Sequence, residues 1–156
     1  MKNKLKHYIK EILSFIVMLF IISNIVSYYK SSNINKSKFD IENISLTNKP
    51  ILVYFWATWC PICKVESPNI QTLSKDYQVV TIAVNSGDDK KISNYLNENN
   101  FDFKVINDKN SSYANKFNIE VFPTTLIYDN DKNLIFSEVG YTSTFGLKLR
   151  LWWAGL

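Results

Sequence analysis

Apolar and polar residues along this chain change their spacing several times, and each change marks a predicted element. Short, nearly continuous apolar runs are typical of buried strands, and they occur at Ile51–Trp56, Gln78–Val84, Phe103–Ile106, Thr124–Tyr128 and Leu134–Val139. The intervening segments predict helices from Cys60 to about Asp76, from Asp88 to about Glu98, over Ser111–Phe117 and from Thr144 onward. Strands that alternate with helices predict an α/β domain in which several strands run parallel.

The last two predicted strands flank the polar segment Asp129–Asn133, so we expect an antiparallel hairpin at the edge of the sheet. The sheet is therefore predicted to be mixed and flanked by helices. We also expect a short first strand within residues 40–46. In the helix that follows Cys60, we place Val65, Ile70 and Leu73 on the inner side.

A long apolar segment precedes the domain. Its eighteen residues from Ile12 to Tyr29 would form a helix about 27 Å long, enough to cross the hydrocarbon core of a bilayer. A cleaved signal peptide and a buried core helix are the alternatives, but no small-residue cleavage site follows the run. We predict an uncleaved transmembrane anchor over residues 11–29. Residues 1–10 would be a lysine-rich cytoplasmic tail, 30–38 a flexible linker and 39–156 a domain on the periplasmic side.

The net charge of +4 is unevenly distributed along the chain. Residues 1–38 carry a net charge of +6, whereas residues 39–156 carry −2. A protein that binds nucleic acid clusters its basic residues on the folded domain. The charge pattern therefore argues against nucleic acid as a partner.

Cys60 and Cys63 are the only cysteines, and they lie where a helix begins directly after the strand Ile51–Trp56. Unpaired N–H groups and the helix dipole stabilise a thiolate at such a position and lower its pKa from about 8.5. Cys60 is therefore predicted as the nucleophile, and Cys63, one turn further on, as the resolving thiol. A structural zinc site needs four ligands, and the single histidine, His7, lies beyond the apolar segment, so we expect no metal.

The string FWATWCPIC resembles the thioredoxin superfamily, together with Glu66, Pro68 and the later sequence Val121-Phe122-Pro123-Thr124. The similarity covers residues 39–156. Within the superfamily, the chain is similar to the membrane-anchored, extracytoplasmic branch that includes TlpA-like and cytochrome-c-maturation thioredoxins. Its ending, VGYTSTFGLKLRLWWAGL, resembles the copper-sensitivity-suppressor disulfide oxidoreductases. The resemblance implies a thioredoxin-like fold preceded by one N-terminal transmembrane helix.

The resemblance also implies roles for residues around the dithiol. Pro123 is expected to follow a cis peptide bond, which would present the backbone of Phe122 to an extended substrate chain. Glu66 is expected to exchange a proton with Cys63, because Tyr54 occupies the position where cytoplasmic thioredoxins carry a buried aspartate. A solvated surface glutamate is the alternative for Glu66. The expected catalytic residues are Cys60, Cys63 and Glu66, and the expected substrate-binding residues are Trp59, Pro61, Ile62, Phe122 and Pro123.

The dithiol and the resemblance predict an extracytoplasmic, membrane-anchored thiol–disulfide oxidoreductase that acts through a redox-active Cys60–Cys63 disulfide and needs no other cofactor. Its expected partners are exported cysteine-containing proteins and a membrane electron-transfer protein, and we favour a reductase over an oxidase. A Cu(I)-binding module on the same fold is the alternative, since two thiolates suit Cu(I), but the domain lacks a histidine as third ligand. A peroxidase on this scaffold would use a lone cysteine.

The helix from Thr144 carries more apolar residues than one buried stripe needs. They are Phe145, Leu147, Leu149, Leu151, Trp152 and Trp153. We expect them to pack on the sheet, and contact of the remainder with a membrane surface or a partner is the alternative.

Overall fold

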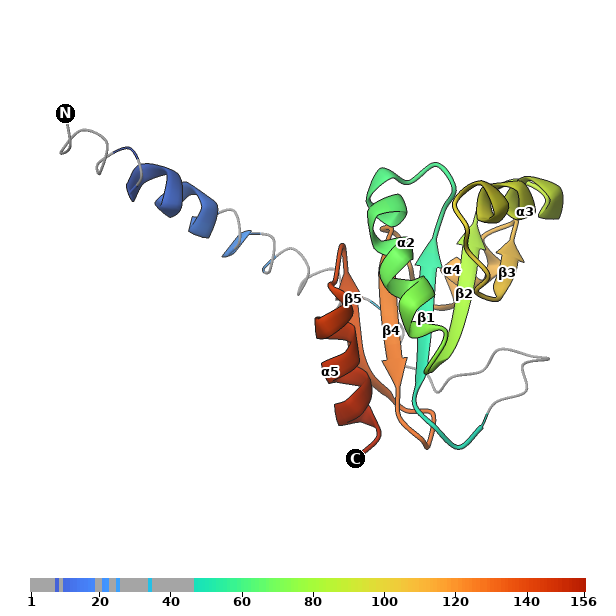
Figure 1. The fold of residues 1–156 in the computed structure, drawn as a ribbon. Helices are drawn as coiled ribbons and strands as arrows, with labels where there is room; N and C mark the ends of the chain where they lie inside the picture. The colour runs from blue at the N-terminus through green and yellow to red at the C-terminus, as the bar shows by residue number, and fades with distance from the viewer. Residues whose placement is uncertain (1–7, 9, 19–20, 23–24, 26–33, 35–46) are drawn as a thin grey trace.

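In the computed structural model, residues 8, 10–18, 21–22, 25, 34 and 47–156 are described (Figure 1). Residues 8, 10–18, 21–22 and 25 are helical. Among the described residues, no helix is both long enough and apolar enough to cross a membrane. The other residues of the predicted anchor 11–29, all of the linker 30–38 except Ile34, and the strand predicted within 40–46 lie outside the described residues.

Five strands form one mixed sheet in the order β3-β2-β1-β4-β5. They are β1 (Ile51–Trp56), β2 (Gln78–Val84), β3 (Val105–Asp108), β4 (Thr124–Tyr128) and β5 (Leu134–Val139). The first three strands are parallel to one another, while β4 is antiparallel to both β1 and β5. All six side chains of β1 are buried, which is the burial expected of a strand covered on both faces.

Successive residues of β1 alternate between two hydrophobic cores, one on each face of the sheet. The first core lies under α2 (Pro61–Leu73), α3 (Asp89–Glu98) and α5 (Thr144–Ala154), with Trp56 and Cys63 among its members. The second core lies under α4 (Ser112–Lys116), and Ile34 from the N-terminal part also packs into it. Figure 1 shows α2 and α5 side by side in front of the sheet, so α5 directly flanks the helix that carries the cysteines.

Most predicted elements are confirmed. Four of the five predicted strands have the expected bounds, and the last two form the expected antiparallel hairpin. The third strand begins at Val105 rather than Phe103, whose ring instead packs edge-on against Trp56 at 5.9 Å between centroids. Asp88 caps α3, because its side chain accepts a hydrogen bond from the N–H of Lys91.

Two expectations about α2 are wrong. The helix ends at Leu73 rather than near Asp76. The N–H of Tyr77 donates a hydrogen bond to the carbonyl of Leu73. Val65 does not face the core and is 65% exposed. The buried face instead follows Cys63, Ser67 and Ile70, which are spaced by four and three residues, and Val65 lies about 200° around the helix from Cys63.

The expectation that the apolar residues of the last helix pack on the sheet holds for only two of the six. Leu147 and Leu151 are buried in the first core. The other four, Phe145, Leu149, Trp152 and Trp153, are exposed. A single helix can bury only the stripe that faces the sheet, so a second apolar stripe must face outward.

Candidate active site

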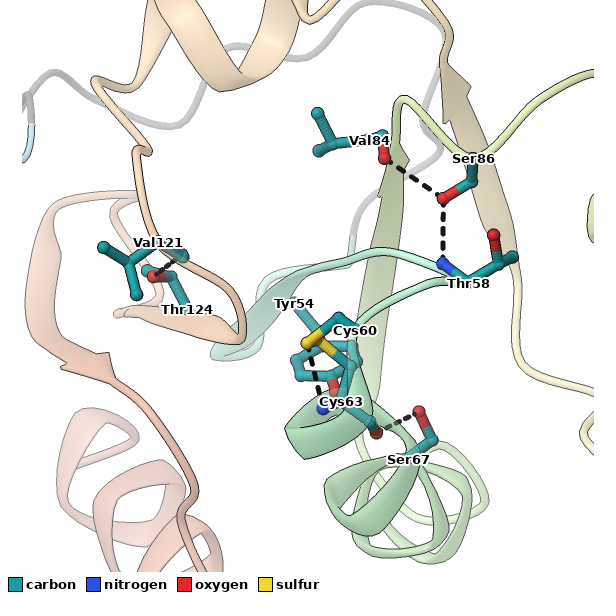
Figure 2. The surroundings of a disulfide bond; sticks show 9 residues. All are labelled: Tyr54, Thr58, Cys60, Cys63, Ser67, Val84, Ser86, Val121 and Thr124. Carbon is teal, nitrogen blue, oxygen red and sulfur yellow. Dashed lines mark hydrogen bonds between the residues drawn. A yellow bond between two sulfur atoms is a disulfide. The ribbon is translucent and has the colours of Figure 1, made fainter.

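The two cysteines form a disulfide at the first turn of α2, directly after the loop that follows β1 (Figure 2). Cys60 is the N-cap residue with extended backbone, and its Sγ accepts a hydrogen bond from the N–H of Cys63 at 3.1 Å. Pro61 occupies the first helical position, where a missing N–H costs nothing. The sulfur of Cys60 therefore lies where the helix N-terminus stabilises negative charge.

The two cysteines differ in exposure. Cys60 is 5% exposed, whereas Cys63 is fully buried in the first core. A partner that approaches from solvent therefore reaches the sulfur of Cys60 first.

The loop that precedes β4 carries a cis peptide bond between Phe122 and Pro123, as expected. The ring of Phe122 packs edge-on against Trp59 at 5.9 Å between centroids, which brings this loop beside the C-x-x-C motif. Trp59 is held in turn by its indole N–H, which donates to the carbonyl of Asn85 at 3.1 Å. The structure therefore brings together segments that are more than sixty residues apart in the chain.

Five residues are predicted to bind substrate, and the structure places them at one end of the sheet around the disulfide. Trp59 and Ile62 are 59% and 50% exposed, and Pro61 is also exposed. Phe122 is half-buried, while Pro123 is buried. Among the described residues, neither the N–H nor the C=O of Phe122 has a hydrogen-bond partner. These two groups can therefore pair with an incoming chain.

Two hydroxyl groups beneath the disulfide donate to the same atom, the carbonyl oxygen of Cys63 (Figure 2). Ser67 donates at 2.8 Å and Tyr54 at 3.3 Å, and both side chains are completely buried. Burial raises the pKa of Tyr54 well above its usual value, and the nearby Glu66 adds to the shift. Tyr54 is thus a fixed donor that positions the backbone of Cys63 rather than a group that exchanges protons.

Glu66 is completely buried, so the alternative of a solvated surface glutamate is wrong. Its Oε1 accepts a hydrogen bond from the N–H of Thr142 at 2.9 Å, and its Oε2 has no partner among the described residues. Burial raises the pKa of Glu66 to about 8; the Thr142 N–H opposes this shift and the charge of Glu138 adds to it. At neutral pH the side chain is mostly an uncharged acid that holds a proton close to the buried cysteine.

Sequence reasoning missed the residues that hold Glu66 and Cys63 in place. Thr142 is 76 positions away from Glu66, and Ser67 is an ordinary helix residue by sequence. Ser67 could have been found from its spacing, because it lies one turn after Cys63 on the same face. Thr142 carried no comparable signal, since only the packing of α5 beside α2 brings it there.

A metal site is the remaining possibility raised by two cysteines. Within the part of the chain that the structure describes, no group of three or more His, Cys, Asp or Glu side chains could hold a metal ion. The only two cysteines of the chain are joined to each other.

The sequence pattern of the Redoxin family matches residues 29–147. The chain belongs to the Redoxin family. It is 34% identical to a thioredoxin-like protein of Haemophilus influenzae over 97% of both chains. It is also 34% identical to the thiol-disulfide oxidoreductase ResA of Oceanobacillus iheyensis, with 51% of this chain matching 44% of that protein.

Solved structures of other proteins share this fold. StoA of Bacillus subtilis superposes with a TM-score of 0.63 over 74% of this chain and 96% of that one, at 19% identity. With the Cys60–Cys63 pair, the relatives identify this Redoxin as a thioredoxin-like protein-disulfide oxidoreductase. Its assignment to the copper-sensitivity-suppressor type stays a prediction.

Proposed function

We propose that this Redoxin is a membrane-anchored, extracytoplasmic reductase of disulfides in exported proteins, with Cys60 as its nucleophile and Cys63 as its resolving thiol. The observation that carries the proposal is the asymmetry of the pair. Cys60 caps α2 and reaches the surface, whereas Cys63 is sealed in the core one turn below it. The two positions suit attack on a partner from outside and resolution from inside.

In the reduced protein, the Cys60 thiolate attacks one sulfur of a substrate disulfide and releases the other as a thiolate. Cys63 then loses its proton and attacks the sulfur of Cys60, which releases the second substrate thiolate. The product is the Cys60–Cys63 disulfide, which is the state of the structure. Two electrons have passed from the protein to its substrate.

Recycling needs a dithiol partner that returns these two electrons, and a membrane electron-transfer protein supplies them in this proposal. Its first thiolate attacks Cys60, and Cys63 leaves as a thiolate inside the core. The partner's second thiolate then attacks the partner sulfur of this mixed disulfide and releases Cys60 as a thiolate. A buried Cys63 thiolate without a nearby cation is costly, so it needs a proton when it leaves. Glu66 is the candidate donor, because it lies one turn from Cys63 and is mostly protonated at neutral pH. It would take the proton back when Cys63 resolves a mixed disulfide.

The surface around Cys60 supports an extended peptide as substrate. Phe122 offers an unpaired backbone N–H and C=O beside the disulfide, so a substrate strand can pair with them. The exposed side chains of Trp59 and Ile62 flank this position and can contact apolar residues of an unfolded chain.

The membrane anchor is proposed from residues 11–29, whose apolar length matches a bilayer core and which follow a lysine-rich N-terminus. An oxidising compartment beyond the membrane is where disulfides persist and require reduction. The proposal therefore places residues 39–156 on the periplasmic side, with no nucleic acid among their partners.

The reduction potential of the Cys60–Cys63 pair tests the direction of electron flow. The purified full-length protein is equilibrated with glutathione buffers, and its free thiols are trapped and counted. Because the chain contains only these two cysteines, every trapped thiol reports on the pair. A potential below about −200 mV supports the reductase, whereas a value near −120 mV would make the protein an oxidant of newly exported proteins. A pair that does not cycle would overturn the mechanism.

A further inference from the structure

Helix α5 has two apolar stripes on opposite sides. The inner stripe consists of Leu147, Leu151 and Ala154, which are buried. The outer stripe consists of Phe145, Leu149, Trp152, Trp153 and the following Leu156, which are 78%, 51%, 58%, 61% and 84% exposed. These positions repeat at helical spacing, so they form one continuous apolar surface. A helix on the surface of a soluble domain normally carries polar residues there.

We propose that the outer stripe of α5 docks onto the headgroup region of a phospholipid bilayer and holds the domain against the membrane. Tryptophan, phenylalanine and leucine beside basic residues are typical of helices that lie in a membrane interface. Two adjacent tryptophans, Trp152 and Trp153, occupy the stripe, and no other segment of the chain has such a pair.

The charge of this segment is complementary to an anionic bilayer surface and argues against a basic protein partner. From Gly140 to Leu156 the chain contains Lys148 and Arg150 but no aspartate or glutamate. Arg150 forms an ion pair with Glu138 at 2.6 Å, so Lys148 supplies the net positive charge of the helix. A positive charge beside an apolar stripe complements the anionic lipids of a membrane surface.

The orientation of α5 leaves the disulfide accessible when the outer stripe is docked. Gly155, at the tryptophan end of α5, lies so close to Pro50 that a Cβ on Gly155 would be 3.3 Å from Cγ of Pro50. Pro50 precedes β1, whereas Cys60 follows the other end of that strand, about 20 Å away for six residues. Figure 1 shows the C-terminus and the start of the Cys60 helix at opposite ends of the sheet.

The tether to the proposed anchor keeps the domain as a whole near the bilayer. Ile25 is helical within the apolar segment, and Ile34 is buried in the second core. Nine residue steps separate them, which span at most about 30 Å when fully extended. The argument from the tether depends on the proposed anchor. The arguments from the apolar stripe and from its charge do not depend on it.

The four tryptophans of the full-length protein make the proposal directly testable. None lies before Trp56, so the predicted anchor contributes no signal, and Trp152 and Trp153 are half of the total. The full-length protein is reconstituted into liposomes of brominated phosphatidylcholine and phosphatidylglycerol, and its emission is compared with that in the same lipids without bromine. We expect bromine to quench roughly half of the emission, because it quenches indoles that enter the interface.

The double variant Phe145→Ser/Leu149→Ser removes apolar area and keeps all four reporters, and both side chains are exposed, so the fold is retained. We expect the tryptophan emission of this variant to be the same in brominated liposomes as in liposomes without bromine. Lys148→Glu should reduce quenching in the anionic liposomes. The matched control is Val65→Ser, an equally exposed apolar position on α2, which should leave quenching unchanged.

Absence of quenching in the wild-type protein, or equal quenching in the double variant, overturns the proposal. Sedimentation of the protein in detergent identifies the main competitor, because self-association lost in the double variant would assign the stripe to a second copy of the chain. Carbonate extraction of the liposomes reports on the anchor separately. A protein that carbonate removes from the liposomes, but whose tryptophan emission is quenched by bromine before extraction, would contradict the proposed anchor and support docking.

Discussion

Helices α2 and α5 lie side by side on one face of the sheet, yet they depart from the usual pattern in opposite ways. Helix α2 buries polar groups, because Glu66 and Ser67 face the core beside Cys63. Helix α5 exposes apolar groups, because its outer stripe faces away from the core. A buried polar group needs a partner, and an exposed apolar stripe needs a cover. A helix that departs from the usual amphipathic pattern therefore marks a candidate site for chemistry or for contact.

The largest expected effect concerns the two cysteines at the start of α2. Cys60→Ser removes the more exposed of the two cysteine sulfurs, so reduction of a disulfide substrate such as insulin should fall at least about a thousand-fold. Cys63→Ser is the control, since it should retain the first attack and accumulate mixed disulfides visible on non-reducing gels. Mixed disulfides that accumulate in Cys60→Ser instead would reverse the two roles.

The second effect is the pH dependence caused by Glu66. Its pKa is raised from 4.5 to about 8 in the folded protein, so the folded state retains a proton that the unfolded state has lost. The stabilisation is fully present below about pH 4.5 and is lost as the pH rises through 8, up to about 4 kcal/mol between pH 5 and pH 9.

Glu66→Gln keeps the shape of the side chain and cannot ionise. Urea unfolding at several pH values should therefore show a flatter profile for Glu66→Gln, and the two proteins should differ most at high pH. A parallel profile for the two proteins would mean that Glu66 is ionised throughout. Thiol–disulfide exchange followed over the same pH range then shows whether this proton also serves the reaction.

The third effect separates the two stripes of α5. Leu147→Ala leaves a cavity in the first core and should lower the free energy of unfolding by about 3 kcal/mol. Leu149→Ala is the matched control, two residues away on the outer stripe, and should change it by less than about 0.5 kcal/mol. Equal losses in the two variants would show that the outer stripe is packed within the protein.

The smallest effect concerns the hydroxyl groups. Ser67→Ala removes one of the two buried donors to the carbonyl of Cys63 and should cost about 1 kcal/mol in unfolding free energy. Thr72→Val is the control, because its hydroxyl makes the same bond to the residue four positions earlier, Pro68, but at an exposed position. That variant should be close to neutral. A larger loss in Thr72→Val would show that burial does not set the cost.

Sequence reasoning was sound wherever the signal was local. The central strand, the cysteines at the start of α2 and the polar turn of the hairpin each consist of adjacent residues, so their patterns can be recognised without the rest of the chain. It failed for Val65, although Cys63, Ser67 and Ile70 already shared one face at helical spacing. Val65 is apolar, but helical spacing from Cys63 places it on the outer face of α2.

The order of the elements, the dithiol at a helix N-terminus and the excess of apolar residues in the last helix can be predicted from the chain alone, because these properties depend on neighbouring residues. The face that each helix buries depends on the packed fold. The packed fold places Glu66 against Thr142 and leaves the outer stripe exposed, because the rotation of a helix about its axis depends on what the sheet and its neighbouring helices can accommodate. The burial of Glu66 and the exposure of the outer stripe of α5 are therefore properties of the packing.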